Sequence, residues 1–353
     1  MDIIQHMSPK VKIGLLGSTG YTGAKLVELL LLRNDISIEF LGSQQYAGQK
    51  FSSVYPRISS ELKCKEIDET FIKSLDKKDI DIVFFATPSG IAHKFTPTLN
   101  EKGIHVIDLS ADYRFRDLSV YEKHYGFKRQ DKELNDKAIY GLVEFKSKEI
   151  KAAAKQGAVV IGNPGCYTTS SILALSPALK NCADLIDKDS IIVDGKSGIS
   201  GAGRKAATEI IYAELNESCS PYNLGGQHRH TPELEVFYSE LLGSEIKVDF
   251  SPHLVAMTQG LLTTNYLKFT RDMTEEKLRA IYKEEYKDSK TVKVLEAGVY
   301  PKTLWAKNNN NAYIQINYNT DTRRATFTCA IDNLVKGAAG QAIENMDLVI
   351  ASA

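Results

Sequence analysis

The chain has 353 residues, with 44 lysines and arginines against 44 aspartates and glutamates, and 43% of its residues are hydrophobic. These proportions are typical of a globular protein and exclude a largely disordered one. Because the formal charge is zero, the chain lacks the basic excess by which proteins bind nucleic acid or acidic membranes, so we expect a small-molecule partner instead. At about 150 residues per domain, the length predicts two domains.

The sequence shows no targeting segment and no disulfide pattern, so we expect a cytoplasmic protein. The apolar cluster at 26–32 is interrupted by Glu28 and is far shorter than the ~20 residues that span a bilayer, so no membrane segment is expected. Residues 1–10 have no basic region and no cleavage site, and we interpret them as a loose leader rather than a secretory signal. The cysteines are far apart, which argues against a disulfide framework or a metal site. They are Cys64, Cys166, Cys182, Cys219 and Cys329.

Short β-branched runs alternate with helical periods in the first part of the chain. The predicted strands cover 11–17, 36–42, 80–86 and 104–110, and the predicted helices cover 23–34 and 90–102. Such repeats indicate parallel βαβ units, and strands that are apolar on both faces indicate helices on both sides. We therefore predict an α/β, Rossmann-type doubly wound sheet in residues 11–165. Within it, residues 110–144 are expected to be a loop region with short elements before a strand at 158–162.

The composition changes after Gly165. A helix is predicted from Cys166 and another from Thr231, and strands are predicted at 190–195, 261–269, 312–318 and 325–332. Longer strands with polar alternation favour a mostly antiparallel sheet, so residues 166–332 are expected to form an α+β second domain. Residues 333–353 have one apolar helical face, and we expect this C-terminal helix to dock on the first domain and complete it.

A glycine-rich turn joins the first predicted strand to the first helix. Gly17, Gly20 and Gly23 are spaced so that the backbone turns tightly, approaches a ligand closely and packs the helix on the sheet. The spacing departs from the usual GxGxxG, and the alternative is a turn that binds nothing. The flanking strand and helix favour nucleotide binding. The expected cofactor-binding residues of the turn are Gly17, Ser18, Thr19, Gly20, Tyr21, Thr22 and Gly23.

The end of the second strand discriminates between NAD and NADP. In an NAD site an acidic residue at this tip holds the ribose 2′-hydroxyl. Here Glu39 is followed by more strand residues, whereas Ser43 and Gln44 occupy the tip. Neutral donors tolerate a 2′-phosphate that a carboxylate would repel, so the sequence predicts NADP(H) as the cofactor.

One cysteine stands in a setting typical of a nucleophile. The run at 161–167 ends a strand and places Cys166 in the first turn of the next helix. A helix N-terminus lowers the pKa of a thiol and offers backbone N–H groups to an oxyanion. The alternative, a small buried hydrophobic residue, is the expected role of the other four cysteines.

A thiolate nucleophile requires a base, and two histidines are candidates. Thr231 before Pro232 resembles an N-cap with proline at the first helical position, which would place His230 at the mouth of the helix, close to His228. An imidazole there can face a cleft. The alternative is that one or both histidines are solvated or bonded to a nearby carbonyl.

Two further stretches are expected to hold an anion. The Gly/Ser-rich residues 195–204 follow an apolar strand and include Ser197 and Arg204, which could bind a carboxylate or a phosphate unless the stretch is only a flexible loop. Arg114 and Arg116 follow the strand at 104–110, at the sheet edge where α/β folds bind ligands. Surface ion pairing is the alternative, mainly for Arg116.

Taken together, these motifs resemble the phosphorylating aldehyde dehydrogenases, and among them most closely the N-acetyl-gamma-glutamyl-phosphate reductases, relatives of the aspartate-semialdehyde and glyceraldehyde-3-phosphate dehydrogenases. The matching motifs are GSTGYTG (17–23), SADYRF (110–115), GNPGCY (162–167), SGISGAGR (197–204), GGQHRHTPE (225–233), PHLVAMTQG (252–260) and DNLVKGAAGQA (332–342). One departure is Thr168, where the family often has proline; we expect little chemical consequence.

The resemblance implies NADPH-dependent reduction of N-acetyl-L-glutamyl 5-phosphate to the 5-semialdehyde, with release of phosphate, in arginine biosynthesis. It implies that Cys166 forms a thioester and that a histidine, His230 in preference to His228, is the acid and base. The implied substrate-binding residues are Arg114, Asn163, Ser197, Arg204 and Glu233, and Ser197, Gly198 and Asn333 join Ser43 at the cofactor. No metal is implied, and a homodimer or homotetramer built on the second domain's sheet is expected.

Three alternatives stay open at this point. An aminoadipyl-phosphate reductase of lysine biosynthesis would use the same machinery in a pocket fitted to one more methylene, a discrimination of only about 1–3 kcal/mol. An aspartate-semialdehyde dehydrogenase shares the plan, but HRHTPE and SADYRF argue against it. A catalytically silent NADP-sensing regulator would keep the fold, although the retention of Cys166, His228 and His230 argues against that.

Overall fold

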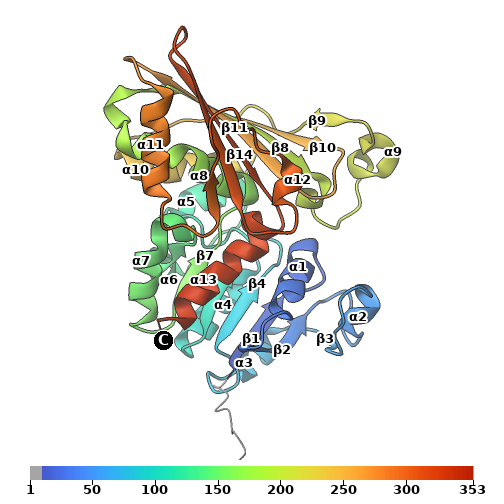
Figure 1. Cartoon of the computed structure of the whole chain (residues 1–353). Coiled ribbons are helices and arrows are strands. Elements are labelled where there is room, and N and C mark those ends of the chain that lie inside the picture. Colours follow the sequence, from blue (N-terminus) through green and yellow to red (C-terminus); the bar gives the residue numbers. More distant parts are fainter. Residues whose placement is uncertain (1–9, 353) are drawn as a thin grey trace, which may run out of the picture. The chain divides into compact units, whose positions relative to one another are not determined.

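The computed structural model describes residues 10–352, so most of the predicted leader lies outside the described residues, as does Ala353. The chain divides into two compact units (Figure 1). Unit 1 comprises residues 10–163 and 342–352, and unit 2 comprises residues 164–341. Within the described part of the chain, no helix is long and apolar enough to cross a membrane.

Unit 1 contains a seven-stranded sheet in which every neighbouring pair is parallel, as predicted. The strand order is β3-β2-β1-β4-β5-β7-β6. The strands are β1 (Val11–Leu16), β2 (Ile36–Gly42), β3 (Cys64–Lys65), β4 (Ile82–Phe85), β5 (His105–Asp108), β6 (Ile139–Tyr140) and β7 (Val160–Gly162). All residues of β4 and β5 are buried, because these central strands are covered on both faces.

Helices follow the strands of unit 1 along the chain. They are α1 (Tyr21–Leu30), α2 (Phe51–Val54), α3 (Glu69–Ser74), α4 (Ala92–Glu101), α5 (Leu118–Tyr125), α6 (Lys132–Lys137) and α7 (Val143–Ala154). The predicted loop region 110–144 contains α5, α6 and β6, so short elements do occupy it. The helix α7 was not predicted, and only its Ile150 and Ala154 are buried.

The second sheet lies in unit 2 and is mixed, with four antiparallel and two parallel pairings. Its order is β12-β13-β14-β11-β8-β10-β9. The strands are β8 (Ile186–Gly198), β9 (Cys219–Pro221), β10 (Asp249–Val255), β11 (Leu261–Phe269), β12 (Val292–Val294), β13 (Ala312–Asn319) and β14 (Arg324–Ile331). The helices are α8 (Cys166–Asn181), α9 (Tyr212–Leu215), α10 (His230–Leu242), α11 (Glu275–Glu285) and α12 (Thr303–Ala306).

The helix α8 is the core of unit 2. Thirteen of its sixteen residues are buried, because it packs on β11 and β14 between α10 and α11. The fold prediction, a Rossmann-type sheet followed by an α+β unit with a mostly antiparallel sheet, is therefore confirmed.

Three predicted boundaries differ in the structure. The stretch 195–204 was expected to be a loop, but β8 continues to Gly198 because it pairs with β10 and β11 there, and Ile199–Ala202 form a 3-10 helix. The helix predicted from Thr231 begins at His230, with Pro232 in its first turn, where a backbone N–H has no intrahelical partner to lose.

The C-terminal helix begins later than the predicted residue 333. A π-helical turn covers Val335–Ala339, and the α-helix α13 covers Gly340–Ile350. Within unit 1, Asn345 Nδ2 on α13 donates to the Gly141 carbonyl at 2.8 Å, and Arg33 pairs with Asp347 at 2.8 Å.

Candidate active site

The turn between β1 and α1 has the close approaches that its glycines require. Gly17 has a φ of +77°, and a Cβ there would lie 2.3 Å from the Ala86 carbonyl oxygen. A Cβ on Gly23 would lie 2.2 Å from the Gly17 carbonyl oxygen. Both positions exclude any larger residue, since β4 and α1 pack directly on the turn. Gly20 is the N-cap of α1, and Tyr21 and Thr22 begin that helix.

The side chains of the turn bind it to the end of β2. Ser18 is fully buried, and its Oγ donates to the Gly42 carbonyl at 3.1 Å. Thr19 Oγ1 and Ser43 Oγ lie 2.7 Å apart, and Tyr55 OH donates to the Thr19 carbonyl at 3.0 Å. The Ser18 hydroxyl thus stabilises the fold, whereas the Thr19 and Ser43 hydroxyl groups lie side by side at the tip of β2.

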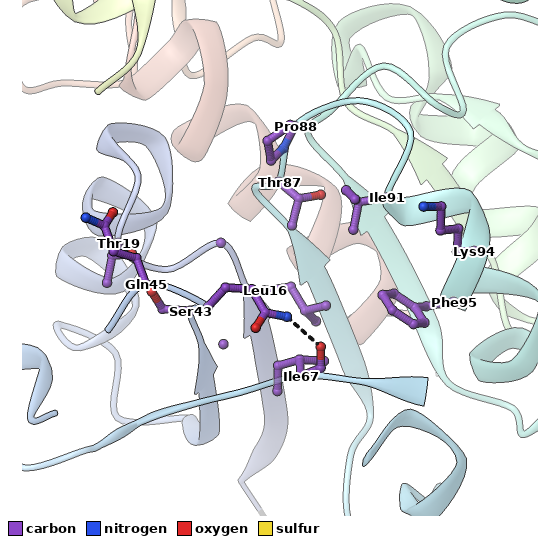
Figure 2. A pocket seen from close by; sticks show the side chains of 13 residues that line it. Leu16, Thr19, Ser43, Gln45, Ile67, Thr87, Pro88, Ile91, Lys94 and Phe95 are labelled. Carbon is purple, nitrogen blue, oxygen red and sulfur yellow. Dashed lines mark hydrogen bonds between the residues drawn. The ribbon is translucent and has the colours of Figure 1, made fainter. Parts of the chain in front are cut away.

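A cavity of about 550 Å³ opens beside these hydroxyl groups (Figure 2). It is lined by Leu16, Gly17, Thr19, Gly42, Ser43, Gln44, Gln45, Ile67, Thr87, Pro88, Ile91, Lys94 and Phe95. One wall has the apolar side chains of Ile91 and Phe95 together with Lys94, and the wall across from it has neutral polar groups. An apolar slot with a few polar groups fits the adenosine end of a dinucleotide, and the glycine cradle beside it fits a pyrophosphate.

The tip of β2 carries no carboxylate toward this cavity. Glu39 lies inside β2, as the sequence predicted. It is exposed and does not line the cavity. Gln44 Nε2 donates to the Ile67 carbonyl at 2.9 Å.

Arg114 does not point to open solvent. Its Nε donates to the Asn163 carbonyl at 2.7 Å, and its Nη2 donates to the Leu109 carbonyl at 3.1 Å. Asn163 is fully buried, and its Oδ1 accepts from Asn345 Nδ2 at 3.0 Å. The Arg114 and Asn163 side chains therefore stabilise the backbone at the end of β7.

Two buried carboxylates organise the loop after β5. Burial, followed by the nearby Asp112 charge, raises the pKa of Asp108 to about 6. Burial opposes ionisation of Asp112 as well, but hydrogen bonds from His93 and Tyr121 lower its pKa to about 2. Asp112 also accepts from the Gly90 N–H at 2.8 Å and the His93 N–H at 3.1 Å. These bonds fix the start of α4, next to the cavity.

In unit 2, Cys166 is the first residue of α8, as predicted, and its side chain is partly exposed. Gly165 is the N-cap, and its carbonyl accepts the Thr169 N–H at 2.8 Å. The π-helical turn passes directly behind the thiol, because a Cβ on Gly337 would lie 2.7 Å from the Cys166 Cβ. Cys166 thus lies at the N-terminus of α8 and packs against Gly337, which has no side chain.

The two histidines have different surroundings. The His230 ring lies against the turn that precedes Cys166, since a Cβ on Gly165 would lie 2.3 Å from His230 Nε2. His228 is buried; its Nδ1 accepts the His230 N–H at 3.0 Å, and its Nε2 lies 3.3 Å from Tyr222 OH. Burial, and then the His230 imidazole, lower the pKa of His228 to about 3.

Glu233 joins α10 to the start of α8. It is 2% exposed, and its Oε1 accepts the Gly165 N–H at 3.0 Å and lies 2.8 Å from Thr168 Oγ1. Thr168 is fully buried, and its hydroxyl also lies 2.7 Å from the Gly165 carbonyl oxygen. The threonine at this position therefore adds a polar contact to the carboxylate that a proline could not make.

A second cluster surrounds the end of β8. Ser197 is buried, and a Cβ on Gly201 would lie 2.9 Å from its Oγ. The Gly198 N–H donates to the Gly260 carbonyl at 2.8 Å. Asn333 is buried here, with Nδ2 donating to Ser200 Oγ at 2.9 Å and Oδ1 accepting the Gly260 N–H at 2.9 Å.

The structure thus brings most of the expected residues of unit 2 into two clusters, one around Cys166 and one around Ser197. Arg204 is the exception, because it is exposed beyond the 3-10 helix. Sequence reasoning missed Gly337 behind the cysteine, although the small-residue run at 337–340 was a signal. It also missed Lys94 in the cavity. In residues 10–352 no group of three or more histidine, cysteine or acidic side chains is arranged to hold a metal.

A thiol at a helix N-terminus beside an imidazole can attack an activated carbonyl and hold the resulting covalent adduct. Two family profiles match the chain. The profile described as the semialdehyde dehydrogenase NAD binding domain matches residues 12–153, and that described as the semialdehyde dehydrogenase dimerisation domain matches residues 166–333.

Curated relatives cover nearly the whole chain. An N-acetyl-gamma-glutamyl-phosphate reductase 1 of a Nostoc species is 42% identical over 345 residues, covering 97% of this chain and 94% of the relative. The reductase of Moorella thermoacetica is 40% identical over 343 residues, with 96% and 95% covered. The reductase of Campylobacter jejuni is 42% identical over 344 residues, also with 96% and 95% covered. The resemblance seen in the motifs is confirmed.

Solved structures share the fold at low identity. Aspartate semialdehyde dehydrogenase II of Vibrio cholerae superposes with a TM-score of 0.73 at 16% identity, covering 98% of this chain and 99% of the other. The aspartate semialdehyde dehydrogenase of Candida albicans, solved with NADP, superposes with a TM-score of 0.69 at 17% identity, covering 97% and 99%.

Proposed function

Because the chain belongs to the N-acetyl-gamma-glutamyl-phosphate reductases of the semialdehyde dehydrogenase family, we propose that it reduces N-acetyl-L-glutamyl 5-phosphate to N-acetyl-L-glutamate 5-semialdehyde and phosphate. The place of this step is arginine biosynthesis. The observation that carries the proposal is the arrangement around Gly165, where a partly exposed cysteine opens a helix and an imidazole lies against the preceding turn.

The first half of the reaction is acyl transfer to Cys166. The thiolate attacks the acyl carbon of the substrate, the bond from that carbon to the phosphate oxygen breaks, and phosphate leaves with the electron pair. The product is a thioester on Cys166. The helix N-terminus favours the thiolate, and it stabilises the oxyanion that forms as the carbonyl is attacked.

The second half is reduction of the thioester. The reduced nicotinamide of a bound cofactor supplies the hydride. Hydride adds to the thioester carbon, and the oxygen takes a proton from a general acid to give a thiohemiacetal on Cys166. On collapse that hydroxyl proton returns to the same group, the carbon–sulfur bond breaks, and the aldehyde and the Cys166 thiolate are released. His230 is the proposed acid and base, because its ring lies beside the nucleophile's turn.

His228 is proposed to support His230 rather than to exchange protons itself. Its Nδ1 accepts the His230 N–H, so this nitrogen is unprotonated, and its lowered pKa keeps the ring neutral across the physiological range. Glu233 and Thr168 are proposed to hold Gly165, which orients Cys166.

The remaining site residues keep the roles that the sequence implied, as proposals. Arg114, Asn163, Ser197 and Arg204 hold substrate anions or shape their site, while residues 17–23, Ser43, Gly198 and Asn333 serve the cofactor. NADP(H) is the proposed cofactor, supported by the neutral tip of β2 and by the Thr19 and Ser43 hydroxyl groups beside the cavity.

The test is the reverse reaction. N-acetylglutamate semialdehyde, phosphate and NADP are mixed with the protein, and formation of NADPH is followed by absorbance for wild type and Cys166→Ser. Phosphate-dependent NADPH formation that disappears in the variant supports both the reaction and the nucleophile. Activity only with the aminoadipate semialdehyde would assign the enzyme to lysine biosynthesis. Cofactor binding with no turnover of either aldehyde would favour an NADP-sensing regulator.

A homodimer or homotetramer in the cytoplasm completes the proposal. The match of residues 166–333 to a profile described as a dimerisation domain supports self-association, which light scattering of the purified protein tests. None of the five cysteines, all of which lie in the described part of the chain, forms a disulfide, as is typical of a reducing compartment.

A further inference from the structure

The cavity beside β2 contains one charged side chain. Of its lining residues, all within the described part of the chain, Lys94 alone is ionisable. Its side chain lies on the wall across from Thr19 and Gln45, with the nitrogen turned toward the cavity (Figure 2). One cation and no carboxylate in the lining favour a more negative ligand over a neutral or less negative one.

The position of Lys94 is fixed by its helix. It lies in the first turn of α4, whose start is held by Asp112 through the Gly90 and His93 N–H groups. The lysine is exposed at the mouth of the cavity, and no ion pair within residues 10–352 involves its ammonium group. It is therefore available to a ligand that enters.

The wall across from Lys94 supplies only neutral polar groups. Gln44 is bonded to the Ile67 carbonyl, and the Thr19 and Ser43 hydroxyl groups are bonded to each other. Hydroxyl groups can donate to a phosphate, but they cannot balance its charge. NADP differs from NAD by a 2′-phosphate, which carries nearly two negative charges at neutral pH.

We propose that Lys94 is a specificity-determining residue, which supplies the positive charge that selects the cofactor with a 2′-phosphate over the one without it. This inference rests on the proposed function, because it takes the cavity to be the adenosine site of a dinucleotide. An ammonium group forms a stronger hydrogen bond with a phosphate than with the uncharged edge of adenine. The 2′-phosphate is therefore the expected partner of Lys94.

Binding measurements without substrate test the proposal. The fluorescence of NADPH and NADH is titrated with wild type, Lys94→Met and Lys94→Arg, and 2′,5′-ADP is compared with 5′-AMP by calorimetry. Loss of one charged contact predicts that Lys94→Met weakens NADPH and 2′,5′-ADP by about tenfold. NADH and 5′-AMP should change less than about twofold, and Lys94→Arg should restore most of the preference.

Salt provides an independent signature. The ratio of NADPH to NADH affinity should fall with ionic strength in wild type and lose most of that dependence in Lys94→Met, because exposed charges are screened over about 10 Å at 0.1 M salt. Lys123→Met, an exposed lysine on α5 of the same unit, controls for a general loss of positive charge.

Two results would overturn the inference. An equal loss of NADPH and NADH affinity would place Lys94 at the part of adenosine that both cofactors share, and an unchanged NADPH affinity would remove it from the site. Failure of the proposed reaction is a separate outcome: a protein that binds NADPH through Lys94 but does not turn over the semialdehyde keeps this inference and loses the proposed function. Binding of neither cofactor would contradict both.

Discussion

The imidazole of His230 fills the space where a side chain at Gly165 would lie. A Cβ on Gly165 would stand 2.3 Å from Nε2 and 2.6 Å from Cε1 of that ring. The relationship joins the start of α10 to the residue before the cysteine, and it requires glycine at 165 for steric reasons alone. It is also the contact that distinguishes His230 from His228.

Gly165→Ala should therefore reduce catalysis without affecting the cofactor. The new methyl group displaces the imidazole, and a misplacement of about 1 Å can cost about 100-fold in rate. We expect kcat to fall by about that factor, while the Kd of NADPH stays unchanged because the cradle lies in unit 1. A variant with full kcat would show that the imidazole position is not important. The melting temperature identifies any general loss of folding.

Substitutions of His230 and His228 should have different effects on kcat and on stability. His230→Asn removes the acid and base, and a loss of about 10²–10⁴-fold in kcat is expected with little change in stability. His228→Leu removes the acceptor of the His230 N–H and should lower stability as well as activity. His228→Asn offers an acceptor in a similar place and should recover part of both. Equal kinetic losses in His230→Asn and His228→Asn, at unchanged stability, would contradict the assignment.

Much of this arrangement could be predicted because it is local in sequence. Gly17 and Gly23 belong to one turn, and Cys166 follows a strand and a Pro-Gly pair at a helix start. Such positions are determined by backbone rules that act within a few residues. The parallel order of the first sheet was predictable for the same reason, since each crossover connection is contained in one βαβ unit.

Contacts between distant segments could not be predicted in this way. The small-residue run at 337–340 indicates close packing, but it does not indicate that Gly337 packs on Cys166. The extension of β8 to Gly198 depends on pairing with strands that come more than fifty residues later. Lys94 resembles any other charged residue of a surface helix until the cavity is known. Tertiary packing decides these positions, and one sequence carries little signal for them.

Thr168 should contribute to stability through its hydroxyl group. The side chain is fully buried with its Oγ1 2.8 Å from Glu233 Oε1. Thr168→Val keeps the shape but removes a donor from a buried carboxylate, a change that costs about 1–3 kcal/mol. Thr168→Pro should lose a similar amount and keep the helix, because the third helical residue has no intrahelical acceptor for its N–H.

Urea unfolding of Thr168→Val, Thr168→Pro and Thr168→Ser measures this contribution. The serine variant retains the hydroxyl and is the matched control for its loss. Valine and serine variants of equal stability, both below wild type, would attribute the effect to packing of the methyl group instead.

His105 should make stability depend on pH. The side chain is 8% exposed, and its Nδ1 accepts the Val159 N–H at 3.2 Å. Burial, and then the Lys77 charge, lower its pKa from 6.5 to about 4. The unfolded chain therefore binds this proton more readily than the native one. The stabilisation is fully present above pH 6.5 and is lost as the pH falls toward 4, with a slope of up to about 1.4 kcal/mol per pH unit.

The comparison of wild type with His105→Gln isolates this slope. Glutamine keeps an acceptor for the Val159 N–H but does not titrate. The free energy of unfolding of the His105→Gln protein should therefore fall less steeply than that of wild type between pH 6.5 and pH 4. The comparison is necessary because Asp108, with a pKa raised to about 6, acts in the opposite sense, losing stabilisation as the pH rises. Since Asp108 is present in both proteins, it cancels in the difference. Parallel pH profiles for the two proteins would show that His105 is protonated equally in the folded and unfolded chains.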